Sequence, residues 1–500
     1  MEAAGRDIMV TSAVEDIDDK KVIDITDVPI EELRWCTVAL SEVLTRGSRL
    51  DASVFDIEGK HARDVLSQCK WDLVQLCGKL GLSTSYYPSR FKRIWVEESE
   101  YPIYQPSQIV EAYPQPNAWL SEITKANFDE LRAKKGQILL TRSGTIGKCT
   151  VVSNTLSDKI ISDDMIHIDC NQPFDVGYIY AFLRTRIGGV LVNTNTYGAV
   201  ISHIEPEHLE EVLIPNPAKE IKVKINDSIM KSFSLRDESN KLIDKAHDLL
   251  KEELRLPELK DLKPKYFNAD ADLRSYSVKL SELSNRLDGS YHVPVIDSIM
   301  DHIKRHSSEV KDIADPGISK DIILPGRFKR VYVEEGQGTV FFGGKQLYEL
   351  DPSNKKYLSL QHHAKRIKEQ LTLEENMIMI TCSGTIGKVM LAPKHWEGWT
   401  ANQHIIRVVP ADDSVAGYIY AWLSTPYGYE LVHRFTYGAV VDEIDDNHVS
   451  QVQIPLLNNK EKQKEINDLV LEANRKRYEA YVLEQQAIRV VEDEVIQEIK

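Results

Sequence analysis

Two copies of the hexapeptide SGTIGK, at residues 143–148 and 383–388, contain glycines, hydroxyls and a lysine, which are residue types that can cradle a phosphate. A nucleotide-binding P-loop has four residues between its glycines, a Ser or Thr after its lysine, and then a helix. Here two residues separate the glycines, Lys148 is followed by Cys149, and the second copy continues with Val389. Because apolar or β-branched runs flank each copy, the pattern predicts a strand, a glycine turn and a second strand.

The sequence lacks the residue patterns of several familiar enzymes. An adenine methylase needs Asp or Asn followed by two prolines and an aromatic residue, whereas TPYG at 425–428 begins with Thr and has one proline. The zinc-binding pattern H-E-x-x-H is absent. Asp163 and Asp164 are candidate metal ligands, but the residues 240 positions later, Gln403 and His404, are not carboxylates. We therefore predict a loop at these aspartates, and no catalytic residues and no metal site in this chain.

Size and composition predict a multidomain protein whose overall charge does not favour nucleic acid. Its 500 residues exceed one ordinary core, and its formal net charge is −15, whereas nucleic-acid binders are usually basic. Any DNA contact must therefore rest on local basic patches and on partner proteins. No apolar run is long enough to span a bilayer, and the six cysteines lack metal-binding spacing, which fits a reducing cytoplasm. Residues 1–30 hold eight acids and three bases, which predicts a disordered acidic leader over residues 1–34 and no signal peptide.

The chain contains an internal repeat. Six anchor motifs recur in the same order, 237 to 240 positions apart, which predicts a duplicated domain. The anchors that begin with Gly-Tyr have apolar residues at helical spacing and are predicted to be core. The pairs are RLDAS at 49–53 with RLDGS at 286–290, RFKRIWVEE at 90–98 with RFKRVYVEE at 327–335, SGTIGK at 143–148 and 383–388, GYIYAFLRT at 177–185 with GYIYAWLST at 417–425, TYGAV at 196–200 and 436–440, and Ile-Pro at 214–215 and 454–455.

The segments between the RFKR and SGTIGK anchors differ between the two copies. Residues 99–135 have little in common with residues 336–375, although the frame around them is shared. One scaffold that presents two different recognition surfaces would produce this pattern. Neutral drift in surface loops is the alternative explanation.

A long stretch suited to helix follows each copy. Residues 217–256 contain no Gly and no Pro after Pro217, and residues 459–500 contain neither. Forty helical residues extend about 60 Å, so two such helices can pair antiparallel and separate the two copies. Two amphipathic helices, each packed on its own domain, are the alternative. Small residues in the imperfect heptad seams predict close helix approach. The seam positions are Ile221, Ser228, Leu235, Leu242, Leu249 and Leu256, with weaker positions Ile225, Ser232, Ser239, Ala246 and Glu253, in the first helix, and Ile466, Ala473, Ala480 and Ala487, beside Leu469, Leu483 and Val490, in the second.

Together these motifs resemble the specificity subunit of type I restriction–modification systems. The resemblance covers residues 35–500 and rests on RLD at the start of each unit, ILLTRSGTIGK and IMITCSGTIGK, GYIYAFL and GYIYAWL, TYGAV, and the closing Ile-Pro. Each motif alone is weak, but their order, found twice, is specific. The resemblance implies an α+β fold in which two duplicated target-recognition domains are separated by two long helices that form an antiparallel coiled coil with pseudo-two-fold symmetry.

The resemblance also implies binding without chemistry in this chain. Each domain would read one half of a bipartite site in double-stranded DNA. Two methyltransferase subunits would use S-adenosylmethionine to methylate adenine at N6, and restriction–translocase subunits would use ATP and Mg, whereas this cytoplasmic chain would hold no cofactor and contact no membrane. The expected boundaries are an acidic leader at 1–34, the first recognition domain at 35–216, a central spacer helix at 217–257, a linker at 258–274, the second recognition domain at 275–458, and a C-terminal spacer helix at 459–500.

Candidate DNA-binding residues lie in the shared frame and in the divergent segments. Each RFKR segment is predicted to be a strand with basic residues on one face that contact phosphates, and an ordinary solvated strand is the alternative. Hairpin lysines and turn glycines are further phosphate candidates, and polar residues are expected to read base edges. The predicted DNA-binding residues are Arg90, Lys92, Arg93, Arg142 (replaced by Cys382 in the second copy), Ser143, Gly144, Thr145, Lys148, Arg327, Lys329, Arg330, Lys345, Gln346, Ser383, Gly384, Thr385, Lys388, Asn402 and Gln403, with Gln105, Gln108, Gln115 and Asn117 as further base-reading candidates, and Tyr197 and Tyr437 predicted to brace turns.

Three other functions stay open on the sequence. The first is a nucleotide-binding enzyme built on the SGTIGK loops. The second is an interaction scaffold that uses its paired domains to bind protein and not DNA. The third is a specificity subunit of another phage-defence system that contains a methylase.

Overall fold

The structure is a computed structural model that describes residues 37–45, 52–194, 203–262, 277–283, 286–352 and 355–497. The chain divides into two compact units, residues 1–50 and 51–500, and each is described by itself. In the first unit the described residues contain the helix α1 (Leu40–Thr45). The predicted acidic leader lies outside the described residues, and the predicted domain boundaries stay predictions. All the elements below belong to the second unit.

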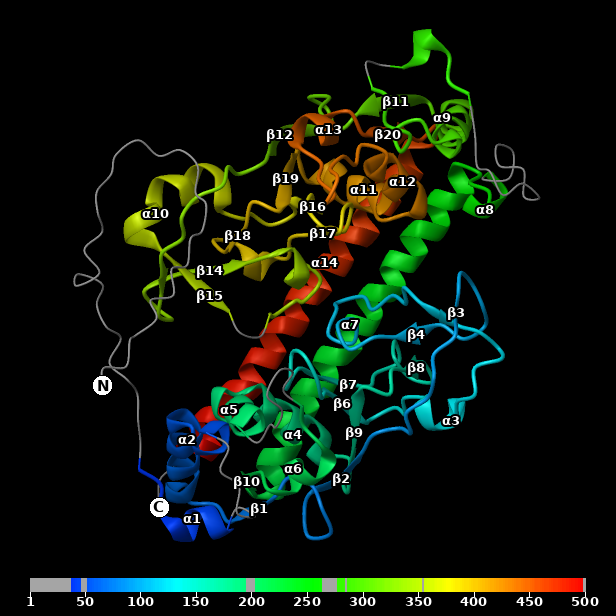
Figure 1. The fold of residues 1–500 in the computed structure, drawn as a ribbon. Helices are drawn as coiled ribbons and strands as arrows, with labels where there is room; N and C mark the ends of the chain where they lie inside the picture. The colour runs from blue at the N-terminus through cyan, green and yellow to red at the C-terminus, as the bar shows by residue number, and fades with distance from the viewer. Residues whose placement is uncertain are drawn as a thin grey trace, which may run out of the picture. The chain divides into compact units, whose positions relative to one another are not determined.

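A four-stranded antiparallel sheet with the order β2-β9-β6-β7 lies in the first repeat (Figure 1). Strands β6 and β7 are wholly buried, as their apolar composition predicts. The turn between them holds Gly144 and Gly147 at φ +71° and +85°, which glycine adopts without strain. The predicted strand, glycine turn and strand are therefore confirmed in this copy. The bounds are β2 (Ser83–Tyr86), β6 (Ile138–Thr141), β7 (Cys149–Val151) and β9 (Met165–Cys170).

The second repeat contains an antiparallel sheet of the same kind, with the order β12-β19-β16-β17. Its hairpin strands are also buried, and Gly384 and Gly387 have φ values of +77° and +80°. The repeated motifs thus form the same sheet order twice. The bounds are β12 (Ser319–Ile323), β16 (Ile378–Thr381), β17 (Val389–Leu391) and β19 (Ile405–Pro410).

The remaining strands show where the two repeats agree and where they diverge. The closing Ile-Pro motif lies in an antiparallel pair in both repeats, β1 (Leu73–Gln75) with β10 (Leu213–Pro215) and β11 (Glu309–Asp312) with β20 (Gln453–Leu456). The divergent segments differ in structure as well as in sequence. In the first repeat they contribute to two short pairs, β3 (Trp95–Val96) with β5 (Trp119–Leu120) and β4 (Ile103–Tyr104) with β8 (Ile160–Ile161); in the second they contribute to one sheet of β13 (Tyr332–Val333), β15 (Lys356–Ser359), β14 (Gly338–Phe342) and β18 (Thr400–Ala401).

The Gly-Tyr anchors form α4 (Asp175–Arg184) and α11 (Asp413–Leu423), which are largely buried, as predicted. Each anchor glycine touches the backbone of a long helix. A Cβ on Gly177 would lie 2.5 Å from Asn226 Cα, and one on Gly417 would lie 2.4 Å from the Asn467 carbonyl oxygen. Other helices are α2 (Ile57–Gln68), α3 (Phe128–Leu131), α5 (Arg186–Thr194), α6 (Pro206–Glu210), α8 (Leu259–Leu262), α9 (Pro294–His306), α10 (Leu360–Arg366), α12 (Pro426–His433) and α13 (Asp446–Ser450), with short helical turns at Ala52–Phe55, Leu280–Glu282, Gly344–Gln346, Ile367–Leu371, Lys394–Trp396 and Val491–Ile496.

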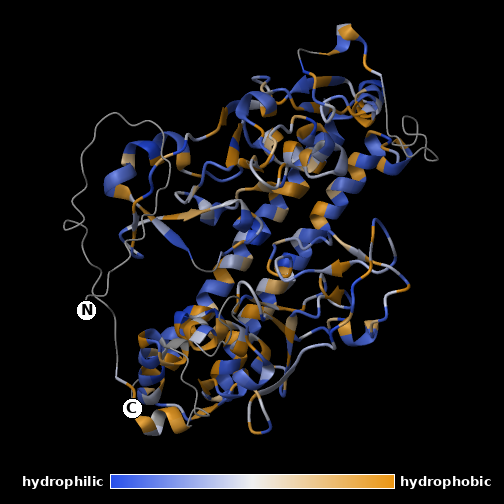
Figure 2. Ribbon diagram, in the orientation of Figure 1, coloured by the Kyte–Doolittle hydropathy of each residue, from blue (hydrophilic) through white to orange (hydrophobic). Residues whose placement is uncertain are grey.

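The two predicted long helices are α7 (Lys219–Glu253) and α14 (Lys460–Val490), and they lie side by side in antiparallel orientation (Figure 1). Near one end of α7, Lys224 pairs with Glu494 at 2.8 Å, and near the other, Lys245 pairs with Glu465 at 3.3 Å. Between them, Ser232 Oγ donates to the Ala480 carbonyl at 2.7 Å, so the helices approach closely there. Figure 2 shows hydrophilic residues mixed with hydrophobic ones along both helices.

The predicted ranking of the two α7 seams is wrong. The weaker seam is buried at Ile225, Ser232, Ser239 and Ala246, whereas the stronger one is only half-buried at most of its positions. Ser232 contacts α14 directly, since its hydroxyl donates to the Ala480 carbonyl, and Leu242 and Leu249 pack on the core of the second repeat. In α14 the predicted positions Ile466, Ala473, Ala480 and Ala487 are all buried, which confirms that seam.

Each long helix contributes to the core of both repeats. The first repeat's core includes Ile225 and Ile229 of α7, but also Ala487 and Ile488 of α14. The second repeat's core includes Ile466 and Val470 of α14, but also Ile243, Ala246 and Leu250 of α7. The alternative of two helices packed only on their own domains is therefore wrong. The described residues form an α+β fold, and none of their helices has the length and apolar character needed to cross a membrane.

Candidate nucleic-acid interface

The RFKR anchors place exposed basic side chains at equivalent positions of the two repeats. Arg90 and Lys92 are exposed, as are Arg327 and Lys329. Arg327 pairs loosely with Glu443 at 3.5 Å and its side chain stays 81% exposed, whereas the other three form no ion pair within the described residues. These side chains are free to contact phosphate. The predicted strand is wrong in its position, since β3 and β13 begin only after the basic residues.

The last arginine of each anchor is used inside its own repeat. Arg93 donates to Ser162 Oγ at 3.2 Å and pairs with Asp163. Its counterpart Arg330 donates to Gln403 Oε1 at 2.7 Å. Because Asp163 and Gln403 occupy equivalent positions, each arginine ties its RFKR segment to the same turn of its repeat. The structure thus brings together two predicted residues, Arg330 and Gln403, that the sequence could not pair.

The tips of the SGTIGK hairpins are exposed in both repeats. Gly144 and Thr145, and likewise Gly384 and Thr385, are solvent-exposed. A Cβ at either glycine would meet nothing within 4 Å, so a ligand has room to approach the backbone there. The backbone amide of Gly384 already donates to the Asp442 carbonyl at 2.9 Å, which corrects the expectation that this amide is free for a phosphate.

The serines of these hairpins are half-buried. Ser143 Oγ donates to Asp164 Oδ2. Ser383 pairs through its backbone with Glu443 in an isolated bridge. Both serines therefore contribute to holding the hairpin in place beside its neighbouring loop.

The structure argues against the prediction that Arg142 contacts DNA. Its side chain is 1% exposed, pairs with Glu205 and lies 4.0 Å from Asp164. The guanidinium also lies 4.6 Å over the Tyr87 ring. Because both carboxylates approach this buried cation, Arg142 braces the hairpin to the neighbouring loop and is not available to a phosphate.

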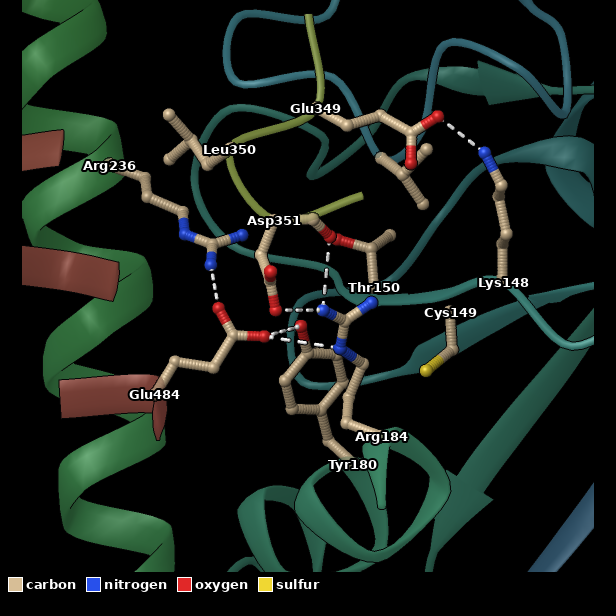
Figure 3. Close-up of a pocket in the computed structure, with 11 residues that line it drawn as sticks. Lys148, Cys149, Thr150, Tyr180, Arg184, Arg236, Glu349, Leu350, Asp351 and Glu484 are labelled. Carbon is tan, nitrogen blue, oxygen red and sulfur yellow. Dashed lines mark hydrogen bonds and ion pairs between the residues drawn. The ribbon is translucent and has the colours of Figure 1, made fainter. Parts of the chain in front are cut away.

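The hairpin lysines are also drawn into the protein, contrary to expectation. Lys148 pairs with Glu349 of the other repeat, and its side chain is 16% exposed (Figure 3). Lys388 lies 3.6 Å from Glu111 and stays 38% exposed. Lys148 therefore serves an internal contact. Lys388 makes a similar contact but stays partly exposed.

The predicted base-reading residues divide in the same way. Lys345 is exposed and has no ion pair in the described part of the chain. Gln346 accepts the Gly343 amide at 3.3 Å, and Asn402 Oδ1 accepts the His404 amide at 2.9 Å. These two polar groups help to form their own turns, which corrects the view of them as free polar loop residues.

In the first repeat, Gln108 is 5% exposed and bonds to the Gln105 amide and the Gln115 carbonyl, so it braces a loop and cannot read bases there. Gln115 and Asn117 are exposed. Tyr197 lies outside the described residues. Tyr437 exchanges two backbone hydrogen bonds with Glu443, at 3.0 and 2.8 Å, as the predicted turn brace requires.

Two exposed aromatic residues at equivalent positions were missed. Trp95 is 49% exposed and Tyr332 is 43% exposed, each two positions after the last arginine of its RFKR anchor. The signal was present in the repeated pattern R-F-K-R-[IV]-[WY]-V. An exposed ring beside basic side chains is suited to apolar contact with a base edge in a groove of DNA.

The histidine in this region does not add positive charge at neutral pH. Burial, followed by the nearby Arg330 and Arg327, lowers the pKa of His404. No group of three or more His, Cys, Asp or Glu residues in the described ranges is placed to hold a metal ion. The basic character of this face comes from Arg and Lys.

Residues 333–471 match the family model for the type I restriction modification DNA specificity domain. The match runs from β13 into α14 and includes the second SGTIGK hairpin. No curated protein matches the chain. Among solved structures, the chain is similar to a type I restriction-modification S subunit from M. genitalium (12% identity, 86% of this chain and 96% of that chain covered, TM-score 0.31) and to the HsdS subunit from Thermoanaerobacter tengcongensis (14% identity, 86% and 97% covered, TM-score 0.26).

The matched segment is a DNA-specificity domain of the type I restriction–modification class. The second repeat thus contains a match to the type I specificity domain, the family that the repeated motifs predict. The match covers the later part of the second repeat, from residue 333 onward, and its RFKR residues lie just before the matched segment. The first repeat shares its anchors and its sheet order.

Proposed function

We propose that this chain reads a bipartite site in double-stranded DNA for a type I restriction–modification complex, with one half-site for each repeat. One observation carries the proposal. A sheet of the same order, with exposed RFKR residues and an exposed glycine hairpin tip, occurs twice, and the second hairpin lies in a segment, residues 333–471, that matches a DNA-specificity domain. Two equivalent surfaces with different inserted segments suit two half-sites of different sequence.

The proposed contacts separate positioning from reading. Arg90, Lys92, Arg327 and Lys329 contact phosphates, and the exposed hairpin tips let the DNA backbone approach. Specificity comes from the divergent segments, which differ between the repeats in both sequence and strand arrangement. Lys345 is a candidate for reading bases there.

The long helices act as the spacer between the two reading surfaces in an antiparallel coiled coil. Half-sites read from one side of DNA lie about 34–36 Å apart, or a multiple of that distance. A helix as long as α7, with 35 residues, extends about 52 Å. This length exceeds one turn of DNA and leaves helix surface for partner subunits.

The chain supplies recognition and its partners supply chemistry. Two methyltransferase subunits bind it and methylate adenine at N6 with S-adenosylmethionine, and restriction–translocase subunits join them with ATP and Mg. The complex works in the cytoplasm of a bacterium or archaeon. Since the net charge is −15, the partners complete the basic clamp around the DNA.

Methylome sequencing of the host with and without this gene tests the proposal. We expect a split adenine-methylation motif that disappears when the gene is deleted, and its two halves are the two half-sites. Restoring the gene with both RFKR segments changed to EFER, which keeps the internal Arg93 and Arg330, should not restore the motif. An unchanged methylome after deletion would refute the proposal.

The same experiments separate the alternatives. An interaction scaffold without a DNA role is favoured by the acidic net charge, and it would tolerate the EFER changes, because these affect only the exposed basic residues. A subunit of another methylase-containing defence system would give the same motif, and neighbouring genes identify the system. Binding of a nucleotide at millimolar concentration would revive the enzyme alternative, although strands flank both hairpins where a P-loop has a helix.

A further inference from the structure

Equivalent short segments of the two repeats, here called the straps, reach across to the opposite repeat. The straps are residues 110–114 and 348–352, which lie 238 positions apart and share the pattern E-x-x-P. The Ala112 amide donates to the Tyr348 carbonyl at 2.7 Å, so the two straps also meet one another. The shared pattern lies inside the divergent segments, where the different flanking residues hide it.

Each strap carries a glutamate that pairs with the hairpin lysine of the other repeat. Glu349 pairs with Lys148 (Figure 3), and Glu111 lies 3.6 Å from Lys388. The two glutamate side chains are only 8% and 11% exposed. A buried carboxylate without its cation is costly, so these two pairs, here called the strap ion pairs, hold each strap against the opposite hairpin.

The straps are also attached beside the long helices. Asp351 accepts a hydrogen bond from Arg184 of α4 at 2.8 Å and one from Gln485 of α14 at 3.0 Å (Figure 3 shows the Arg184 contact). At the equivalent position of the other strap, Tyr113 bonds to Asp244 of α7. The same connection is therefore made twice, with different residues.

The position of the strap ion pairs links them to the candidate interface. The lysines lie in the hairpins β6–β7 and β16–β17, three positions after the exposed threonines of the turns. Strands β7 and β17 are the edge strands of their sheets. Each strap thus holds the edge of one reading surface to the body of the other repeat.

We propose that the straps fix the angle and separation of the two reading surfaces, and that the residues of the strap ion pairs are positioning residues that select the spacer length between half-sites. This inference rests on the proposed function. One added base pair rotates a half-site by about 35° and moves it by about 3.4 Å. Two reading surfaces held at a fixed angle accept one spacer length. If the surfaces are released from each other, the complex also accepts spacers that are one base pair shorter or longer.

The test compares spacer lengths in a methylation assay with the whole complex. The variant Lys148→Met with Glu349→Gln removes one strap ion pair without leaving a buried charge, and Lys388→Met with Glu111→Gln removes the other. The DNAs carry the host's half-sites with the native spacer, one base pair fewer, or one more. Because a displacement of about 1 Å can change a rate by up to about a hundredfold, we expect the variants' preference for the native spacer to fall about tenfold. An unchanged preference in both variants overturns the inference.

The matched control is Lys251→Met with Glu258→Gln, an exposed ion pair outside the straps, which should leave the spacer preference unchanged. If the strap variants fail to fold, Tyr113→Phe replaces them, because it removes only the hydroxyl that bonds to Asp244. This variant should also show a weaker preference for the native spacer. Hydrogen exchange on the free chain should show faster exchange at residues 110–114 and 348–352 in the strap variants. Unchanged exchange would mean that the strap ion pairs do not hold the straps in place. A wild-type complex that methylates none of the DNAs would instead overturn the proposed function.

Discussion

At the residue scale, basic side chains in the same repeat serve different purposes, and their internal contacts decide which. Arg90 and Lys92 extend into solvent, whereas Arg142 ends between Glu205 and Asp164. A guanidinium with carboxylate partners in a buried site would have to lose them before it could contact a phosphate. Exposure and pairing therefore distinguish candidate interface residues from internal braces, and residue type alone does not.

Replacing Arg142 with Cys, the residue present in the second repeat as Cys382, should lower the stability of the chain. The change leaves the partly exposed Glu205 without its cation, at a cost of about 2 kcal/mol or more. Scanning calorimetry measures the loss. Arg90→Cys is the matched control at an exposed arginine and should change the free energy of unfolding by less than about 0.5 kcal/mol. Equal losses in the two variants would contradict the internal role of Arg142.

Glu111 should make the stability of the chain fall as the pH rises toward neutrality. Burial, partly offset by Lys388, raises the pKa of Glu111 from its ordinary 4.5 to about 7. Between these values the folded chain keeps a proton that the unfolded chain has released, so this contribution is full below 4.5 and is lost as the pH rises through about 7. The variant Glu111→Gln does not ionise, and its melting temperature should vary less with pH across this window. If the melting temperatures of the two proteins vary equally with pH, burial does not raise the pKa of Glu111.

At the element scale, the elements with a strong local pattern were predictable from the sequence. The buried hairpin strands follow from apolar runs around glycine turns, and α4, α7, α11 and α14 follow from helical spacing. The seam of α7 was misjudged because heptad position does not say which stripe faces the partner helix. The strand expected at RFKR starts later because its pairing partners, β5 and β15, lie opposite Trp95 and Tyr332.

The candidate site was predictable in residue type but not in its contacts. Arg93 meets Asp163, 70 positions away, and Lys148 meets Glu349, 201 positions away. Nothing in a single sequence reports which distant residues become neighbours. The shared E-x-x-P pattern of the straps was visible in principle, but its role depends on contacts between the repeats.

The anchor glycines should be intolerant of even one methyl group. In Gly177→Ala and Gly417→Ala, the new Cβ meets the backbone of α7 or α14 well inside van der Waals contact, so α4 and α11 must move away from the long helices. We expect each change to cost about 1–3 kcal/mol, measured by thermal unfolding. Gly189→Ala in α5 is the matched control, since its Cβ would meet nothing within 4 Å. That variant should be neutral or more stable by up to about 1 kcal/mol, and a loss as large as that of Gly417→Ala would mean that helix glycines are needed for another reason.

At the scale of the whole molecule, the two repeats share their supports. Residues of α7 and of α14 enter both cores, and the straps connect each hairpin to the opposite repeat. Removing one repeat would therefore expose apolar helix surface and leave strap carboxylates without partners. The two repeats are expected to be stable only together.

The acidic chain as a whole should bind DNA weakly alone and with a steep dependence on salt, because its net charge of −15 opposes the exposed basic residues of the RFKR anchors. A methyltransferase partner should tighten binding. In that complex, Lys92→Gln and Lys329→Gln should each lower the slope of log affinity against log salt by about 0.9. Both should weaken all DNA sequences to a similar extent, because phosphate contacts carry no sequence information. Binding measured over a salt series tests this, with Lys251→Gln as the exposed control. If affinity falls only for the specific site, these lysines read bases and do not contact phosphates. Tight specific binding by the isolated chain would mean that the partners do not complete the clamp.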